Sequence, residues 1–160
     1  DAAFTSESGV VLAIQTADCL PVLLCADDGA QIAAIHAGWR GLAGGVIEAC
    51  VRRLATKPSR LLAWLGPAIA AQSYEVGDEV RKAFLAHAAA AAAAFAETRA
   101  GHWRCDLSAL ARMRLADLGV ERVFGGGFDT FSDSRFYSYR RDAGCSGRMA
   151  SLVWKTGMDG

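Results

Sequence analysis

The 160-residue sequence has no net charge and no long apolar run. Lysine and arginine together number 17, and aspartate and glutamate together also number 17. A protein that binds nucleic acid or an anionic membrane usually attracts that partner with an excess of basic residues. A membrane-spanning helix needs about 18 or more consecutive apolar residues, and no such stretch occurs. We therefore expect neither nucleic acid nor a membrane as a partner.

The sequence also lacks the cysteine pattern of a small secreted protein. Its five cysteines are an odd number and are not densely or regularly spaced, unlike a disulfide framework. Residues 1–8 lack the basic and then apolar pattern of a signal peptide. Both observations indicate a reducing compartment, and the expected location is the cytoplasm.

An initiator methionine is missing, and an apolar run begins within the first ten residues. We expect residues 1–160 to form a single domain that lacks its N-terminal part. Hydrophobic residues make up 52% and charged residues 21% of the chain, a composition typical of globular proteins. A chain of this length buries roughly two thirds of its unfolded surface, which is enough for one core.

Apolar runs and turn residues alternate along the chain in the manner of a mixed protein. Strands are expected at residues 10–15, 20–26, 31–36, 61–65, 120–124, 136–140 and 149–154. Helices are expected at residues 46–54, 80–87 and 107–118. Asp106 is placed to cap the last helix and Gly119 to end it, while the alanines at 88–94 form a surface helix or a connection. This order predicts one α/β or α+β domain.

The first candidate site residues are Asp18 and Cys19, a polar pair between two apolar strands. A thiol at a break between strands can face a cleft, whereas a thiol within a strand is usually a small core residue. Asp18 has two interpretations as well. It is a turn residue that bonds nearby backbone amides, or it orients a ligand or moves a proton.

The second candidate group is His36 and Arg40, where a predicted strand meets a glycine-rich segment. Glycine lets the backbone approach a ligand closely, and an arginine in such a place suits an anion such as phosphate. The alternatives are a structural histidine and a surface ion pair. Cys19 and His36 together suit either a zinc site or a nucleophile and base, but a catalytic zinc normally has three protein ligands.

The third candidate group lies between residues 136 and 148. Ser138, Arg140 and Arg148 are placed to bind phosphate, and the neighbouring tyrosines to stack on a base or another aromatic ring. The alternative is an edge strand with solvated charges.

Four segments together resemble the YfiH family, also known as laccase-domain or multicopper polyphenol oxidase-like proteins. The matching segments are TADCLPVLL from Thr16, HAGWRG from His36, GPAIAAQSYEVGDEV from Gly66 and FYSYRRDAGCSGRMASLVW from Phe136. They occur in the family's order and span nearly the whole chain. The combination of HAGWRG with an ADC about twenty residues earlier is specific to this family.

This resemblance implies a single layered α+β domain with mixed β-sheets flanked by helices, of the cytotoxic-necrotizing-factor-like cysteine hydrolase type. It also implies a zinc ion bound by one cysteine and two histidines. Cys19 and His36 match two of these ligands, and the third is expected upstream of residue 1. The chain departs from the family pattern at Ala70, Ala111 and the pair Asp129-Thr130, which affects substrate contacts rather than membership.

The activity implied is that of a zinc-dependent purine nucleoside phosphorylase, with adenosine deamination as a second reaction of the same site. The catalytic residues would be Asp18, Cys19 and His36, and the substrates a purine nucleoside and phosphate. A copper-dependent polyphenol oxidase is the second hypothesis, although three histidines are too few for several copper sites. A metal-free Cys/His hydrolase and a non-catalytic binding module are the remaining alternatives.

Overall fold

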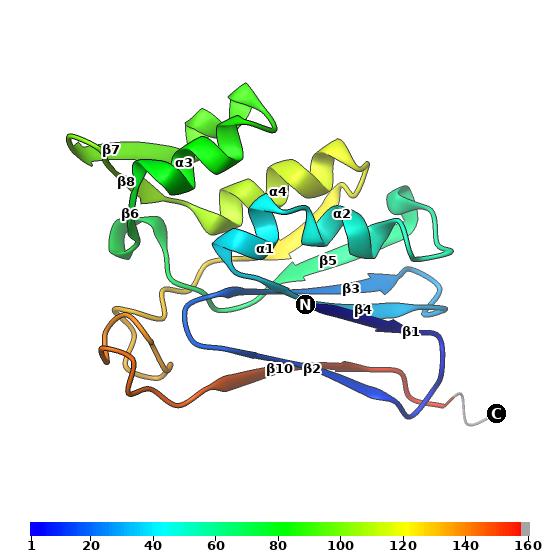
Figure 1. Ribbon diagram of the computed structural model, residues 1–160. Helices are drawn as coiled ribbons and strands as arrows, with labels where there is room; N and C mark the ends of the chain where they lie inside the picture. The colour runs from blue at the N-terminus through cyan, green and yellow to red at the C-terminus, as the bar shows by residue number, and fades with distance from the viewer. Residues whose placement is uncertain (158–160) are drawn as a thin grey trace.

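The computed structural model describes residues 1–157, which fold into three stacked layers. A five-stranded sheet forms the middle layer, helices cover one of its faces, and a two-stranded ribbon lies on the other (Figure 1). Over the described residues, none of the helices has the length and apolar character needed to cross a membrane.

The central sheet has the strand order β1-β4-β3-β5-β9. Its strands are β1 (Ala2–Thr5), β3 (Leu20–Ala26), β4 (Ile32–Ala37), β5 (Leu61–Leu65) and β9 (Arg122–Gly125). Neighbouring strands are antiparallel except for the parallel pair β5 and β9. The near-continuous apolar runs of β3 and β4 place these strands in the middle of the sheet, because a strand buried on both faces shows no alternation.

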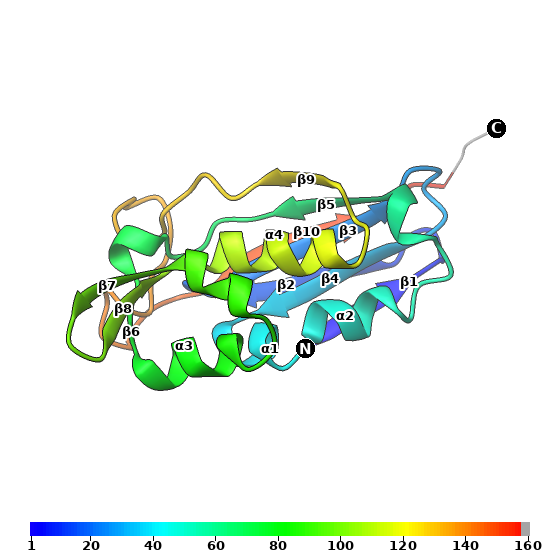
Figure 2. The same cartoon turned by 90° about the horizontal axis from the view of Figure 1, so that it is seen from above.

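Three helices pack on one face of this sheet and form the larger core with it (Figure 2). They are α1 (Trp39–Ala43), α2 (Val46–Val51) and α4 (Leu107–Asp117). The Asp106 side chain accepts a hydrogen bond from the backbone N–H of Ala109 over 2.8 Å and caps α4. Gly119, with φ of 84°, follows the end of this helix in the left-handed conformation.

The ribbon on the other face consists of β2 (Val11–Thr16) and β10 (Met149–Trp154), which pair with Thr16 opposite Met149. Every second residue of β2 is buried, as expected for a strand with one face on a core. Leu12 and Ile14 pack against Ile32 and Ala34 of the central sheet and form a second, smaller core.

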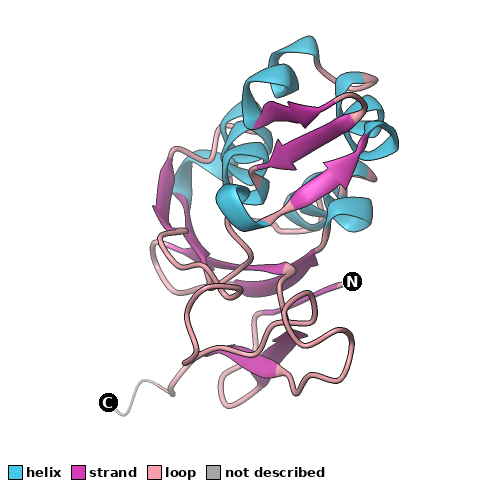
Figure 3. Cartoon of the chain, turned by 90° about the vertical axis from the view of Figure 1, so that its left-hand side faces the viewer, coloured by secondary structure: helices cyan, strands magenta, loops and turns pink. Residues whose placement is uncertain are grey.

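A separate three-stranded sheet lies at one end of the molecule beside α3 (Asp78–Leu85) (Figure 3). It contains β6 (Glu75–Gly77), β7 (Phe95–Arg99) and β8 (His102–Cys105). The alanines at 89–94 form a 3₁₀-helix, η3 (Ala89–Ala94), in which Ala91 and Ala94 are buried. Short 3₁₀-helices also occur at η1 (Pro58–Arg60) and η2 (Ala71–Ser73).

The predicted α+β class is confirmed, and most predicted elements form within a residue or two of their expected bounds. The strand predicted at 136–140 is wrong, because these residues form a turn-rich loop. The predicted helix at 46–54 already ends at Val51, and a short helix, α1, occupies the segment expected to be a glycine-rich loop. Strands β1, β6, β7 and β8 were not predicted.

Candidate active site

Four chain segments from distant parts of the sequence meet at one end of the central sheet. They are the β2–β3 turn, the β4–α1 junction, the segment after β5 and the long loop between β9 and β10 (Figure 1). Their side chains line a cleft of about 430 Å³ that contains both Cys19 and His36. A second hollow of about 220 Å³ adjoins it and shares Cys19, His36, Trp39 and Arg40. The larger volume falls within the roughly 300–1,000 Å³ typical of small-molecule sites.

The strand register brings Cys19 and His36 together. Pro21 of β3 lies opposite His36 of β4, so the turn that carries Cys19 lies beside the end of β4. A Cβ atom added to Gly38 would lie 2.9 Å from Cys19 Sγ and 3.7 Å from His36 Nε2. Both donor atoms therefore face the same small space, and the glycine between them keeps that space open.

This pair fits part of a metal site. A thiolate and an imidazole are the ligands that zinc uses most often, and copper accepts the same atoms. Among residues 1–157, however, no third histidine, cysteine, aspartate or glutamate joins them to complete a ligand group. Asp1 lines the smaller hollow, but its Oδ2 lies 3.9 Å from His36 Nδ1 and its side chain is 94% exposed.

The surroundings of Cys19 and His36 shift the pKa values of both side chains away from their usual values. Burial raises the pKa of the Cys19 thiol, the Asp18 charge raises it further, and Arg148 opposes these effects. Burial also lowers the pKa of His36. At neutral pH the histidine is uncharged, as a ligand or base requires, whereas the thiol keeps its proton unless a cation binds it.

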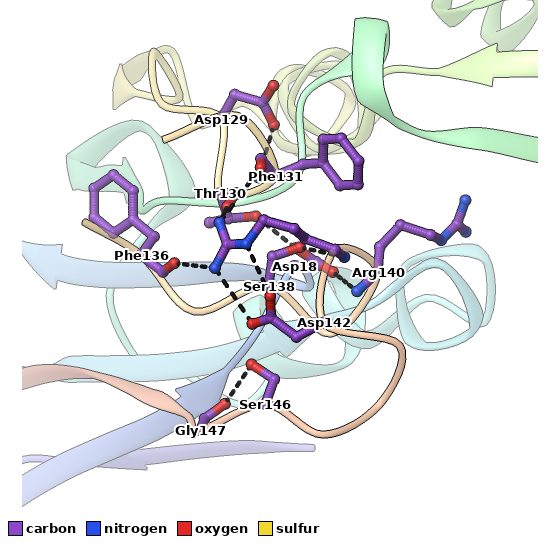
Figure 4. A network of polar contacts seen from close by, with 11 residues as sticks. Asp18, Asp129, Thr130, Phe131, Phe136, Ser138, Arg140, Asp142, Ser146 and Gly147 are labelled. Carbon is purple, nitrogen blue, oxygen red and sulfur yellow. Dashed lines mark hydrogen bonds and ion pairs between the residues drawn. The ribbon is translucent and has the colours of Figure 1, made fainter. Parts of the chain in front are cut away.

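Asp18 ties the walls of the cleft together. Its Oδ1 accepts a hydrogen bond from Thr130 Oγ1 and its Oδ2 accepts one from the backbone N–H of Arg140, each over 2.7 Å (Figure 4). Its carbonyl oxygen accepts the N–H of Ile69 over 3.0 Å. Asp18 is buried and has φ of 84°, a conformation that non-glycine residues rarely adopt. Both carboxylate oxygens are thus engaged in holding loops, which favours a positioning role over proton transfer.

Ser138 does not line the cleft. It is fully buried, and its Oγ accepts the backbone N–H of Arg141 over 3.1 Å. The Arg141 guanidinium in turn donates to the carbonyl oxygens of Thr130 and Phe136 (Figure 4). The sequence prediction placed Ser138 at the substrate, whereas its position suits support of the loop that carries Arg140.

Three arginines of the cleft each stack on an aromatic ring that also lines it. Each guanidinium carbon lies 4.4 to 5.7 Å from a ring centre, within the range of cation–π contacts. The pairs are Arg40 with Trp39, Arg140 with Tyr74, and Arg148 with Tyr139. All six side chains line the larger cleft. Stacking orients each planar guanidinium and leaves N–H groups at its edge to bind an anion.

Sequence reasoning named the three arginines but did not single out Trp39, Tyr74 or Thr16 as lining residues. Trp39 and Tyr74 lie inside segments that the family resemblance covers, HAGWRG and GPAIAAQSYEVGDEV. Burial raises the pKa of Tyr74, so its hydroxyl stays protonated at neutral pH and is able to donate a hydrogen bond. The other two histidines, His87 and His102, do not line the cleft.

The layered α+β fold and a cleft with a Cys/His pair and three arginines define a candidate small-molecule enzyme site. Residues 1–156 match the family described as multi-copper polyphenol oxidoreductase laccase. A Neisseria meningitidis protein of the DUF152 family superposes with a TM-score of 0.96 at 47% identity over 98% of this chain and 65% of its own. The Bacillus licheniformis protein YfiH gives a TM-score of 0.93 at 29% identity over 98% and 61%.

Curated relatives agree with this match. A Xylella fastidiosa protein named purine nucleoside phosphorylase is 55% identical over 157 residues, which is 96% of this chain and 60% of the relative. The Escherichia coli purine nucleoside phosphorylase YfiH is 50% identical over 155 residues, 96% of this chain and 63% of the relative. The chain belongs to the YfiH, or laccase-domain, family. It spans less than two thirds of the length of these relatives.

Proposed function

We propose that this chain carries the active site of a purine nucleoside phosphorylase. The reaction takes a purine nucleoside and phosphate to the free base and ribose 1-phosphate. The observation that carries the proposal is the convergence of the Cys19–His36 pair and three stacked arginines on one cleft of about 430 Å³. Relatives at 50% to 55% identity that are named for this activity support it.

The arginines supply what a phosphate substrate needs. Arg40 is exposed and has its guanidinium stacked on Trp39, with its donors directed to no protein acceptor among residues 1–157. Arg140 donates one hydrogen bond to the Glu75 carbonyl oxygen over 3.1 Å and keeps its remaining donors. Charge-assisted hydrogen bonds from such groups hold a phosphate and offset charge as the new C–O bond forms.

The aromatic rings suit the other substrate. Tyr74 and Tyr139 line the same cleft as the arginines, and aromatic rings bind a flat purine by stacking. The protonated Tyr74 hydroxyl is able to donate to a ring nitrogen or a sugar oxygen. Phosphate and nucleoside would thus meet within one cleft, as a transfer between them requires.

Cys19 and His36 would hold a zinc ion, with a third ligand expected from upstream of residue 1. When bound, zinc supplies a Lewis acid that polarises a substrate oxygen, which also makes adenosine deamination feasible at this site. Asp18 would position both walls through its hydrogen bonds to Thr130 and Arg140.

The test combines metal content with a phosphate-dependent assay. In protein that includes the segment upstream of residue 1, we expect about one zinc per chain, lost in Cys19→Ser and His36→Ala. Inosine or adenosine should be cleaved only when phosphate is present. Arg40→Lys should raise the KM for phosphate about tenfold, because lysine cannot keep the stacked, forked geometry. Arg52→Lys, an exposed change outside the cleft, serves as the matched control. Cleavage that does not depend on phosphate would overturn the proposal.

The family description favours a second candidate, copper-dependent oxidation of phenols. Multicopper oxidases need several histidine-rich sites to pass electrons to oxygen. Within residues 1–157, His36 is the one histidine that lines the cleft. Copper in the purified chain together with oxygen uptake on phenols would support this candidate over the phosphorylase.

A further inference from the structure

Thr16 is a buried hydroxyl without a partner. The residue is 2% exposed, and its Oγ1 has no hydrogen-bond partner among residues 1–157. Thr16 nevertheless lines the larger cleft. Buried polar side chains nearly always have a hydrogen-bond partner, and leaving one unpaired lowers stability. A residue with this cost calls for a reason other than folding.

The strand pattern shows how Thr16 reaches this position. Leu12, Ile14 and Thr16 are the buried residues of β2 and point toward the central sheet. The first two pack in the smaller core, whereas Thr16 ends the strand, where that core gives way to the cleft. Valine has the same shape, and it would continue the apolar pattern without an unpaired group.

We propose that the Thr16 hydroxyl binds the nucleoside, to which it supplies a hydrogen bond on the buried wall of the cleft. This inference rests on the proposed function and deepens it. A phosphate dianion needs counter-charges, and the exposed guanidinium groups of Arg40, Arg140 and Arg148 supply them, so phosphate binds among these three side chains. The buried, uncharged Thr16 hydroxyl instead suits a sugar hydroxyl or a base heteroatom, since it is able both to donate and to accept.

The first test measures melting temperature with and without ligand. Thr16→Val should melt at the same temperature as the unchanged protein or higher, because it removes an unpaired buried hydroxyl. Inosine should raise the melting temperature of the unchanged protein and of Thr16→Ser. The rise should be much smaller for Thr16→Val. Ser151→Ala is the matched control. Ser151 lies opposite Ile14 in the ribbon and outside the cleft, so its loss should leave the inosine effect unchanged.

The second test is kinetic. Thr16→Val should raise the KM for inosine about fivefold to tenfold, the equivalent of one hydrogen bond, and leave the KM for phosphate unchanged. A rise in the KM for phosphate alone, or no change in either, would overturn the assignment. So would a valine variant that is clearly less stable yet binds inosine normally, since the hydroxyl would then bond to a structural water.

The two proposals fail in distinguishable ways. If the unchanged protein cleaves no nucleoside, the phosphorylase proposal fails, while the inosine-induced rise in melting temperature still tests Thr16. If inosine does not raise the melting temperature of the unchanged protein, the Thr16 proposal is overturned. Thr16→Ala replaces the valine variant if valine prevents folding, with the same expected loss of the inosine effect.

Discussion

The carboxylate of Asp18 accepts a hydrogen bond from the backbone N–H of Arg140 over 2.7 Å, although the two residues lie 122 positions apart in the chain. This contact links the turn that carries Cys19 to the loop that carries an arginine of the cleft. One side chain therefore sets the distance between the candidate metal ligand and the candidate phosphate-binding group.

Replacing Asp18 with asparagine tests this link. Asparagine keeps one acceptor oxygen, and its amide nitrogen only donates, so the bonds from Thr130 and from the Arg140 N–H cannot both be kept. We therefore expect the free energy of unfolding to fall by about 1 to 3 kcal/mol. Phosphate binding should weaken as well, because Arg140 is no longer held in place. Denaturant unfolding measures the first effect and phosphate titration the second. Asp133→Asn, which breaks an exposed pair with Arg135, is the control and should change neither appreciably.

Gly38→Ala should weaken metal binding without replacing either candidate ligand. Its added Cβ would lie 2.9 Å from Cys19 Sγ, closer than such contacts normally occur. We expect zinc affinity to fall about 10- to 100-fold, as when groups that orient metal ligands are changed. Competition with a chelating dye measures this affinity. Gly127→Ala is the control, since its Cβ would meet no atom within 4 Å; equal zinc affinity in both variants would contradict the placement.

Cys19 should react slowly with iodoacetamide in metal-free protein at pH 7. Burial raises its pKa, so little of the reactive thiolate is present, and the rate should rise as the pH is increased. Cys145 is exposed and should be alkylated first. Peptide mass analysis over time gives both rates. Rapid alkylation of Cys19 at neutral pH would instead favour the metal-free Cys/His hydrolase.

Asp129 gives a prediction about pH and stability. Burial acts to raise its pKa, but hydrogen bonds from Ser73, Ser132 and the backbone N–H groups of Ala70 and Phe131 lower it overall. A pKa below the unfolded value means that this stabilisation is present above about pH 4 and is lost as pH falls through the folded pKa.

Asp129→Asn should therefore lower the free energy of unfolding by about 1 to 3 kcal/mol at pH 7, where the carboxylate accepts these hydrogen bonds. The difference from the unchanged protein should shrink below the unfolded pKa. Denaturant unfolding at pH 7 and pH 3 measures both values. A difference that stays constant between the two pH values would show that the Asp129 charge does not contribute.

The sequence predicted the central strands well because their signal is local. The apolar runs at 20–26 and 61–65 form strands with those same bounds. Most residues of the first are buried, whereas burial alternates along the second, and both patterns are typical of strands. The strand predicted at 136–140 was wrong for a long-range reason. The buried Ser138 hydroxyl accepts the Arg141 N–H, and the distant Asp18 carboxylate accepts the Arg140 N–H. The alternating polar and apolar residues at 136–140 therefore belong to a loop that these contacts hold in place, and not to a strand.

The candidate site was predictable in part. Motif residues indicated Cys19, His36, Arg40, Arg140 and Arg148, and all five line the cleft. Ser138 was not separable from them, because burial depends on how distant segments fold together. Thr16 carried no signal as a site residue, since a threonine at the end of a strand is common and its missing partner is visible only in three dimensions.

The central sheet and the two-stranded ribbon both contribute residues to the cleft. Trp39 packs against the larger core, whereas Thr16 ends a strand of the ribbon, whose own core is small. A two-stranded ribbon is only marginally stable by itself, so it should open by subglobal unfolding before the central sheet does. A ligand that contacts both sides must leave before the ribbon opens. Hydrogen exchange at the amides of β2 and β10 therefore reports whether the cleft is occupied.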